Sequence, residues 1–249
     1  MLELKNVNVT LGGKQILHDI NLKLIPHTFT ALIGRNGCGK STLVSCIDQS
    51  AAYTGEVLFG SRSLALMRPK ERACLVSALP QHLHAPHITV ESLVSMGRNP
   101  YLDLSRRMRE EDRSAVFEAM ESAGVRDLAA QCLDTLSGGE RQKAYLAMML
   151  AQDTRVMVLD EPTTYTDLPY EHAILSLLRQ LRDTRKKTVL AVMHDLSAAV
   201  RYADRIAVMD AGRILFCGSR EACLREEIIE KTFSAQRCTC GDQIFFTAK

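Results

Sequence analysis

The chain has 249 residues, of which 46% are hydrophobic and 24% are charged, proportions typical of a globular protein. Its 31 basic and 29 acidic side chains leave a formal net charge of +2, which lacks the basic excess of a nucleic-acid-binding surface, so we expect no nucleic acid among its partners. Every apolar run is shorter than the roughly 18 residues of a membrane-spanning helix, and the N-terminus lacks the pattern of a signal peptide. These two observations predict a cytoplasmic protein, and the 8 cysteines, which are scattered along the chain, indicate reduced thiols.

The N-terminal part of the chain predicts strands, a glycine-rich loop and a helix. Apolar positions alternate from residue 2 to residue 24 and are interrupted at Gly12-Gly13, a pattern that predicts a hairpin in an antiparallel sheet. The apolar run 30–33 is followed by the glycine-rich segment 34–42 and then by helical periodicity at Leu43 and Ile47. We therefore expect a strand, a glycine loop and a helix in that order.

The middle of the chain, from about residue 83 to residue 152, has helical periodicity, with helices expected over 106–122 and 140–151. Solid apolar runs return at 156–159 and 189–193, which predicts strands of a parallel sheet that is covered on both faces. Residues 173–182 fit a crossover helix between them. A second hairpin is expected over 206–216, with its turn at 210–212.

The glycine-rich loop fits the pattern G-x-x-x-x-G-K-[ST] at each fixed position. Glycines allow successive backbone N–H groups to face phosphate oxygens at the N-terminus of the helix. Lys40 then reaches the β- and γ-phosphates, and Ser41 binds Mg²⁺. The residues expected to bind the nucleotide here are Gly34, Arg35, Asn36, Gly37, Cys38, Gly39, Lys40, Ser41 and Thr42.

Two carboxylates, Asp160 and Glu161, follow the strand expected at 156–159. Open α/β sheets bind ligands at the carboxyl ends of their strands, so Asp160 is expected to hold Mg²⁺. Glu161 is expected to polarise the attacking water as a general base. The chain lacks an Asn-Lys-x-Asp motif for reading guanine, which favours ATP as the nucleotide.

A second anion-binding motif lies in the helical region, at Ser137, Gly138 and Gly139. Ser137 and Glu140 have the spacing of a helix capping box, and such a helix start also exposes N–H groups to an anion. Because this motif is expected to lie far from the glycine loop of its own chain, we expect it to complete the pocket of a second copy.

This order of motifs resembles the ATP-binding subunits of ABC transporters, over about residues 2 to 216. The resemblance implies an α/β fold in which a P-loop NTPase (RecA-like) core carries an antiparallel β subdomain and an inserted α-helical subdomain. It also implies roles for Gln81, Asp167 and His194. In that family the glutamine contacts Mg²⁺ and the attacking water and senses the membrane partner, the aspartate belongs to the nucleotide site, and the histidine contacts the γ-phosphate.

The implied organisation is a single domain over residues 1–249. It comprises a nucleotide-binding core with the β layer (1–81 and 153–218), a helical part (82–152) and a C-terminal tail (219–249). The expected catalytic residues are Glu161, His194 and Gln81, and the expected Mg²⁺ ligands are Ser41, Gln81 and Asp160.

A narrower resemblance concerns the cargo. The segments 79–82, 94–100 and 160–165 are similar to the ATPases of iron(III)-siderophore, ferric citrate, haem and cobalamin importers, and above all to those for ferric citrate and siderophores. This implies a peripheral protein on the cytoplasmic face of the membrane, which dimerises head to tail and works with separate permease subunits and indirectly with an extracytoplasmic binding protein. The sequence departs from the family at Leu11, where an aromatic residue often stacks on adenine, and at Thr166, where a leucine is usual.

The sequence is also compatible with other interpretations. One is a different cargo, such as haem or cobalamin, and another is a soluble ABC-type ATPase that acts on nucleic acid or the ribosome. His82, His84 and His87 form a candidate metal-binding cluster, although an exposed loop is also expected to be polar without any ligand. Cys38 is expected to have a lowered pKa beside a helix N-terminus.

Overall fold

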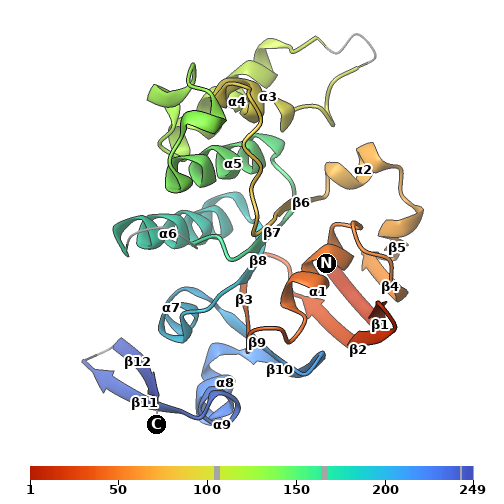
Figure 1. Ribbon diagram of the computed structural model, residues 1–249, viewed down its shortest axis with the longest axis vertical. Helices are drawn as coiled ribbons and strands as arrows, with labels where there is room; N and C mark the ends of the chain where they lie inside the picture. The colour runs from red at the N-terminus through yellow and green to blue at the C-terminus, as the bar shows by residue number, and fades with distance from the viewer. Residues whose placement is uncertain (104–106, 164–167, 242, 249) are drawn as a thin grey trace.

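The computed structural model describes residues 1–103, 107–163, 168–241 and 243–248 (Figure 1). The strands are β1 (Leu2–Leu11), β2 (Lys14–Leu24), β3 (Phe29–Gly34), β4 (Thr54–Phe59), β5 (Arg62–Ser63), β6 (Val76–Leu79), β7 (Val156–Asp160), β8 (Thr188–Val192), β9 (Arg205–Asp210), β10 (Arg213–Ser219), β11 (Ala235–Cys240) and β12 (Gln243–Ala248). The α-helices are α1 (Lys40–Ile47), α2 (Pro69–Ala73), α3 (Val90–Met96), α4 (Glu110–Ser122), α5 (Gly138–Gln152), α6 (Leu168–Arg185), α7 (Leu196–Tyr202), α8 (Arg220–Arg225) and α9 (Ile228–Phe233).

The central sheet has the strand order β10-β9-β3-β8-β7-β6. Its strands run parallel except for β10, which returns antiparallel to β9 as the predicted hairpin. Each residue of β7 and β8 is buried, as expected for strands whose two faces are both covered. The strands predicted at 156–159 and 189–193 are therefore confirmed, as is the crossover helix, which extends over the whole of α6.

The two faces of the central sheet belong to two hydrophobic clusters. Successive side chains of a strand point to opposite faces, so Val189 and Ala191 of β8 lie in one cluster and Leu190 and Val192 in the other. The first cluster contains the apolar side chains of α3 to α7, and the second contains those of α1, β1 and β2. Helix α1 is thereby held between the central sheet and the antiparallel layer (Figure 1).

The antiparallel layer has the strand order β2-β1-β4-β5. The hairpin β1–β2 and its turn at Gly12-Gly13 are confirmed. Strands β4, β5 and β6 and helix α2 were not predicted from the sequence. They are short, and β4 has three exposed residues before its buried pair Val57-Leu58, so its apolar periodicity is weak.

The helices α3, α4 and α5 form a group at one end of the molecule (Figure 1). Arg98, which follows α3, lies with Nε 3.0 Å from Oδ1 of Asp112 in α4 and donates to the carbonyl of Ala151 at the end of α5. This partly buried guanidinium ties the three helices together. Helix α4 begins at Glu110, four residues later than the sequence predicted; residue 106, the predicted start, lies outside the described residues.

The C-terminal segment, expected as a tail, is folded into α8, α9 and the hairpin β11–β12. Residues Ile244 to Phe246 lie in β12, where the backbone N–H of Phe246 donates to Ser197 Oγ in α7. Among the described residues, no helix has both the length and the apolar character needed to cross a membrane.

Candidate nucleotide-binding site

The predicted site residues converge because they follow neighbouring parallel strands. The glycine loop follows β3, Asp160 ends β7, and Gln81 and His194 stand two residues beyond the ends of β6 and β8. These strands are neighbours in the order β3-β8-β7-β6 and run the same way, so their carboxyl ends meet at one edge of the sheet. This is the edge at which open α/β sheets bind ligands.

The conformation of the glycine loop requires glycine at two positions. Gly39 caps α1 with φ 105°, a backbone conformation that residues with a Cβ rarely adopt. Gly34 lies against the neighbouring strand, where an added Cβ would stand 2.4 Å from the carbonyl oxygen of Met209 and 2.7 Å from Cys38 Sγ. The loop therefore presents its backbone at the start of α1 as an anion site requires.

Lys40 lies under this loop and is only 5% exposed. Its Nζ donates to the carbonyl oxygens of Gly34, at 2.8 Å, and Arg35, at 3.1 Å. The ammonium group thus fixes the start of the loop from within. It also supplies a positive charge at the place where phosphate oxygens are expected.

Asp160 is the best candidate for a Mg²⁺ ligand. The residue is 4% exposed, and its Oδ1 is buried without a hydrogen-bond partner among the described residues. Burial raises the pKa of this carboxyl and the charge of Glu161 adds to the rise, while the Ser41 hydroxyl and the positive charge of Lys40 act to lower it. A buried carboxylate oxygen without a partner, beside a serine hydroxyl, fits the oxygen ligands that Mg²⁺ prefers.

Glu161 connects two of the other strand ends. Its Oε1 lies 2.5 Å from Nε2 of His194, and its Oε2 accepts a 2.6 Å hydrogen bond from Nε2 of Gln81. The carboxylate is therefore held by side chains from the ends of β6 and β8. The backbone of Glu161 has φ 54°, a left-handed conformation that is uncommon for a residue with a Cβ and often accompanies a functional site.

The motif at the start of α5 is confirmed as a capping box. Ser137 Oγ accepts from the N–H of Glu140, and the Glu140 carboxylate accepts from the N–H of Ser137 at 2.9 Å. An added Cβ at Gly138 or Gly139 would meet nothing within 4 Å, so the backbone here is open to a ligand. Figure 1 shows α5 grouped with α3 and α4 at one end of the molecule, whereas α1 lies in its middle beside the central sheet, so the motif does not join the site of its own chain.

Three further predicted residues have different outcomes. Leu11 is 52% exposed at the end of β1, so its side chain is accessible, but its role toward adenine stays a prediction. Asp167 lies outside the described residues, as does Thr166. The lowered pKa predicted for Cys38 is wrong: the residue is 6% exposed, and burial raises the pKa of its thiol despite the opposing charge of Lys40.

A separate cavity of 690 Å³ lies between α6, α7, α8 and the C-terminal hairpin, lined among others by Leu175, Tyr202 and Phe245. It does not include the residues of the glycine loop.

The comparisons with known proteins agree with this geometry. A family model described as ABC transporter matches residues 17–164. The ferric enterobactin transport ATP-binding protein FepC of Escherichia coli is 39% identical over 243 residues, covering 96% of this chain and 89% of that protein. The hemin import ATP-binding protein HmuV of Gloeobacter violaceus is 38% identical over 246 residues, covering 95% of this chain and 88% of that protein.

A solved structure is similar in fold over most of the chain. It is the dimeric structure of a bacterial ABC transporter cassette, with a TM-score of 0.80 and 26% sequence identity, covering 88% of this chain and 99% of that one. The sheet order, the glycine loop and the helical group are thus parts of a known arrangement.

Proposed function

Since the chain belongs to the ABC transporter family of ATP-binding subunits, which hydrolyse ATP, we propose that it powers the import of an iron chelate through separate membrane subunits. The observation that carries the catalytic part of this proposal is the contact of Glu161 with both Gln81 and His194, at the edge of the sheet that also carries the phosphate loop. The cargo rests on the relatives.

The proposed ATP site begins with the phosphate loop. Backbone N–H groups from 34–42 receive the phosphates at the start of α1, and Lys40 turns its ammonium group from the carbonyls of Gly34 and Arg35 toward the β- and γ-phosphates. Leu11 offers an aliphatic surface to adenine in place of an aromatic ring, which weakens base stacking by about 1 kcal/mol. Asp167 is proposed to belong to the same site.

Ser41, Asp160 and Gln81 are proposed to hold Mg²⁺. The buried Oδ1 of Asp160, which has no hydrogen-bond partner among the described residues, supports this assignment. The ion supplies positive charge that neutralises the charge developing on the phosphates. This chain's contribution is a carboxylate and a hydroxyl already placed beside Lys40.

Glu161 is proposed as the general base that accepts a proton from the attacking water, with Gln81 and His194 as its partners. Both carboxylate oxygens are engaged in this structure, one by the Gln81 amide and the other by the His194 ring. The contacts fix the position of the carboxylate, and each oxygen keeps a second lone pair that can accept a hydrogen bond from the attacking water. His194 is the partner that is expected to turn away, because it is 46% exposed and its family role is a contact with the γ-phosphate.

A second copy of the chain is proposed to complete each site. Ser137, Gly138 and Gly139 present an open helix start that does not reach the phosphate loop of their own chain. In a head-to-tail dimer this helix start faces the γ-phosphate bound by the partner, so the pocket is complete only when two copies close on ATP. Closing and reopening then supplies the two states that drive the membrane subunits.

The proposed place of the protein is the cytoplasmic face of the membrane, bound to permease subunits that receive cargo from an extracytoplasmic binding protein. Ferric enterobactin and hemin, the cargoes named for two relatives, are both iron chelates, which supports this class. A ferric siderophore or ferric citrate is proposed as the cargo, and hemin is the alternative that the relatives support.

The catalytic proposal is tested with Glu161→Gln and a matched control, Glu56→Gln, an exposed glutamate on β4. Glu161→Gln should slow ATP hydrolysis by about 100-fold or more, the usual contribution of a general base, and still form an ATP-dependent dimer in size-exclusion chromatography. Glu56→Gln should hydrolyse ATP like wild type. Hydrolysis by Glu161→Gln at the control rate would refute the assigned role.

The cargo is tested by uptake of radiolabelled ferric siderophores, ferric citrate, hemin and cobalamin in cells that lack the gene. Wild type should restore uptake of a ferric siderophore or ferric citrate, and Glu161→Gln should not. Restoration of hemin uptake alone would establish the alternative cargo. If no iron chelate depends on the gene, the import proposal fails while the ATPase activity stands.

A further inference from the structure

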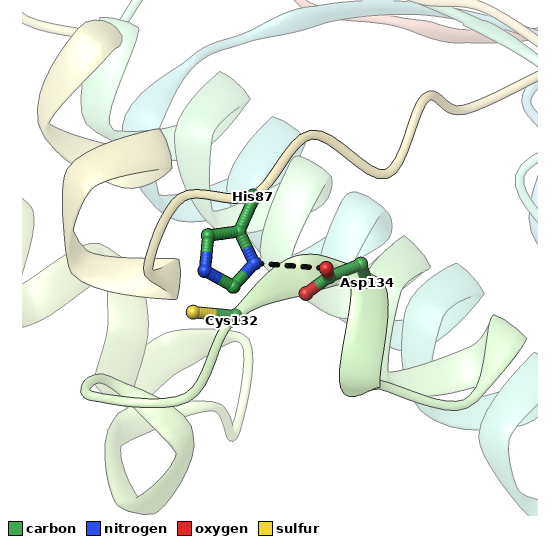
Figure 2. Close-up of side chains that lie close together, drawn as sticks. All are labelled: His87, Cys132 and Asp134. Atoms are coloured by element: carbon green, nitrogen blue, oxygen red, sulfur yellow. Dashed lines mark hydrogen bonds and ion pairs between the residues drawn. The ribbon is translucent and has the colours of Figure 1, made fainter.

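Three side chains of different chemistry lie together outside the nucleotide site. They are His87, in the loop between Gln81 and α3, and Cys132 and Asp134, in the segment just before α5 (Figure 2). One ligand atom from each residue can be chosen so that all three atoms lie within 4.8 Å of one another. His82 and His84, with which His87 was grouped from the sequence, are not part of this cluster.

The geometry of the cluster is set by the backbone. Figure 2 shows the His87 ring directed toward Asp134, with Nδ1 2.9 Å from Oδ2, and the Cys132 sulfur beside the ring. Leu133, which lies between Cys132 and Asp134, is fully buried and donates its N–H to the carbonyl of Ile88 at 3.0 Å. The same two segments also pair at Thr89 and Cys132. The three side chains therefore come from two backbone segments that are hydrogen-bonded to each other.

We propose that His87, Cys132 and Asp134 form a binding site for a divalent transition-metal ion, with Zn²⁺ as the best fit. Imidazole nitrogen, thiolate sulfur and carboxylate oxygen are all ligands of Zn²⁺. A thiolate and a carboxylate together supply two negative charges, which match the charge of the ion. Three protein ligands leave a fourth position for water or another ligand.

The distances suit this ion after small side-chain rotations. In a tetrahedral site, bonds of about 2.0–2.3 Å place ligand atoms about 3.3 to 3.8 Å from one another. The Nδ1–Oδ2 distance of 2.9 Å is slightly shorter than this range, and one ligand atom from each of the three residues can be chosen so that all separations are at most 4.8 Å. The side chain of His87 is 80% exposed and that of Asp134 is 40% exposed, so both can rotate without disturbing the core.

The cluster lies between two segments that lead to the proposed catalytic residues and to the motif for the second copy. His87 lies six residues after Gln81, and Asp134 lies three residues before Ser137. A bound ion therefore joins the segment that leaves the proposed water-activating site to the segment that leads into the motif for the second copy. The two segments are already joined by the 3.0 Å hydrogen bond between Leu133 and Ile88, and the ion would add a second link between them. We expect the ion to reduce local opening of both segments.

The site is tested by titrating the full chain with ZnCl₂ in competition with a chromophoric chelator. Cys238 and Cys240, two exposed thiols on β11, are first replaced by serine to remove a competing pair. The double-serine variant should bind a single ion. Adding His87→Gln, Cys132→Ser or Asp134→Asn to it should weaken binding by about tenfold or more, because even the loss of a group that only supports a metal ligand has an effect of that size. His84→Gln, in the same loop, is the matched control and should bind like the parent.

Two further measurements, the absorption of bound Co²⁺ and the hydrogen exchange of the Zn²⁺-bound chain, test the site even if one variant folds poorly. Co²⁺ in place of Zn²⁺ should give a thiolate-to-metal charge-transfer absorption that Asp134→Asn shifts, Cys132→Ser abolishes and His84→Gln retains. Zn²⁺ should also slow amide hydrogen exchange in residues 84–91 and 130–136, because the bound ion would bridge these two segments. Absence of binding, binding that is unchanged in Cys132→Ser, or lack of the thiolate absorption would each overturn the proposal. These readouts do not involve ATP hydrolysis or transport, so their failure leaves the proposed function standing.

Discussion

The substitution Gly139→Ala separates the effect of the α5 motif on stability from its effect on catalysis. Gly139 has no left-handed φ, and an added Cβ would meet nothing within 4 Å. The alanine is therefore compatible with the folded backbone, and it reduces the conformational entropy of the unfolded chain. We expect the free energy of unfolding to rise by about 0.4–1 kcal/mol. For a chain of this length that raises the melting temperature by about 1–4 °C.

The same substitution should impair ATP hydrolysis. The new methyl group extends about 1.5 Å from the backbone into the space proposed for the partner's γ-phosphate. A displacement of about 1 Å at a reacting group is enough to lower the rate about 100-fold. We therefore expect an ATPase rate near that level, and loss of the ATP-dependent dimer when Gly139→Ala is combined with Glu161→Gln. Steady-state phosphate release and size-exclusion chromatography measure the two effects.

The control is Gly124→Ala, at the end of α4. Its added Cβ also meets nothing within 4 Å, but Gly124 has φ 64°. A left-handed alanine costs about 1–2 kcal/mol, so this variant should lose stability and keep its ATPase activity below its melting temperature. If Gly139→Ala hydrolysed ATP at the wild-type rate, the proposed contact of α5 with a second nucleotide site would be wrong. A lowered melting temperature would instead contradict the reasoning about the backbone.

Three other predictions concern stability and reactivity. Gly34→Ala should lower the free energy of unfolding by about 1–3 kcal/mol, because its Cβ would stand 2.4 Å from a carbonyl oxygen; an unchanged urea midpoint would contradict this. Burial acts to raise the pKa of Asp112, but a backbone N–H and the Arg98 guanidinium outweigh it and lower the pKa. Its stabilisation is thus present above about pH 3.9 and lost as pH falls through the folded-state pKa, so Asp112→Asn should flatten the acid limb of urea unfolding, whereas identical acid limbs would argue against it. Cys38, buried and with a raised pKa, should react with iodoacetamide about tenfold or more slowly than exposed Cys238 in a peptide-mapping time course, and equal rates would count against this.

The sequence was sufficient to predict the parallel strands β3, β7 and β8 and the glycine loop, because each has a strong local signal, whereas the short parallel strand β6 was missed. A strand covered on both faces is a solid apolar run, as at 156–159, and the loop has glycines where the backbone of Gly34 and Gly39 leaves no room for a Cβ. The capping box at Ser137 was predicted for the same reason, since both partners lie within four residues.

The remaining features depend on contacts between segments that are far apart in the chain. The left-handed backbone of Glu161 leaves no mark on residue type, and its bonds to Gln81 and His194 span three strand ends. The lowered pKa expected for Cys38 took account of the helix N-terminus but not of burial, which results from its place in the hydrophobic cluster that contains α1, β1 and β2. His87 meets Cys132 and Asp134 across more than forty residues, so proximity in the sequence grouped it with His82 and His84 instead.

The contacts of Glu161 imply that movement of the loop after β6 changes the catalytic site directly. Gln81 donates a hydrogen bond to the Glu161 carboxylate, which is proposed to activate water. Further along the same loop, the carbonyl of His84 accepts a hydrogen bond from the Tyr145 hydroxyl. The loop then reaches Thr89, which pairs with Cys132. A displacement of this loop by a membrane subunit must either move Glu161 or break the 2.6 Å bond to it. The far end of the loop is hydrogen-bonded to the segment that precedes Ser137. The same displacement would therefore also move the motif that is proposed to contact the second copy. One loop thus connects both halves of the proposed composite site, and an ion bound at His87 would stiffen that connection.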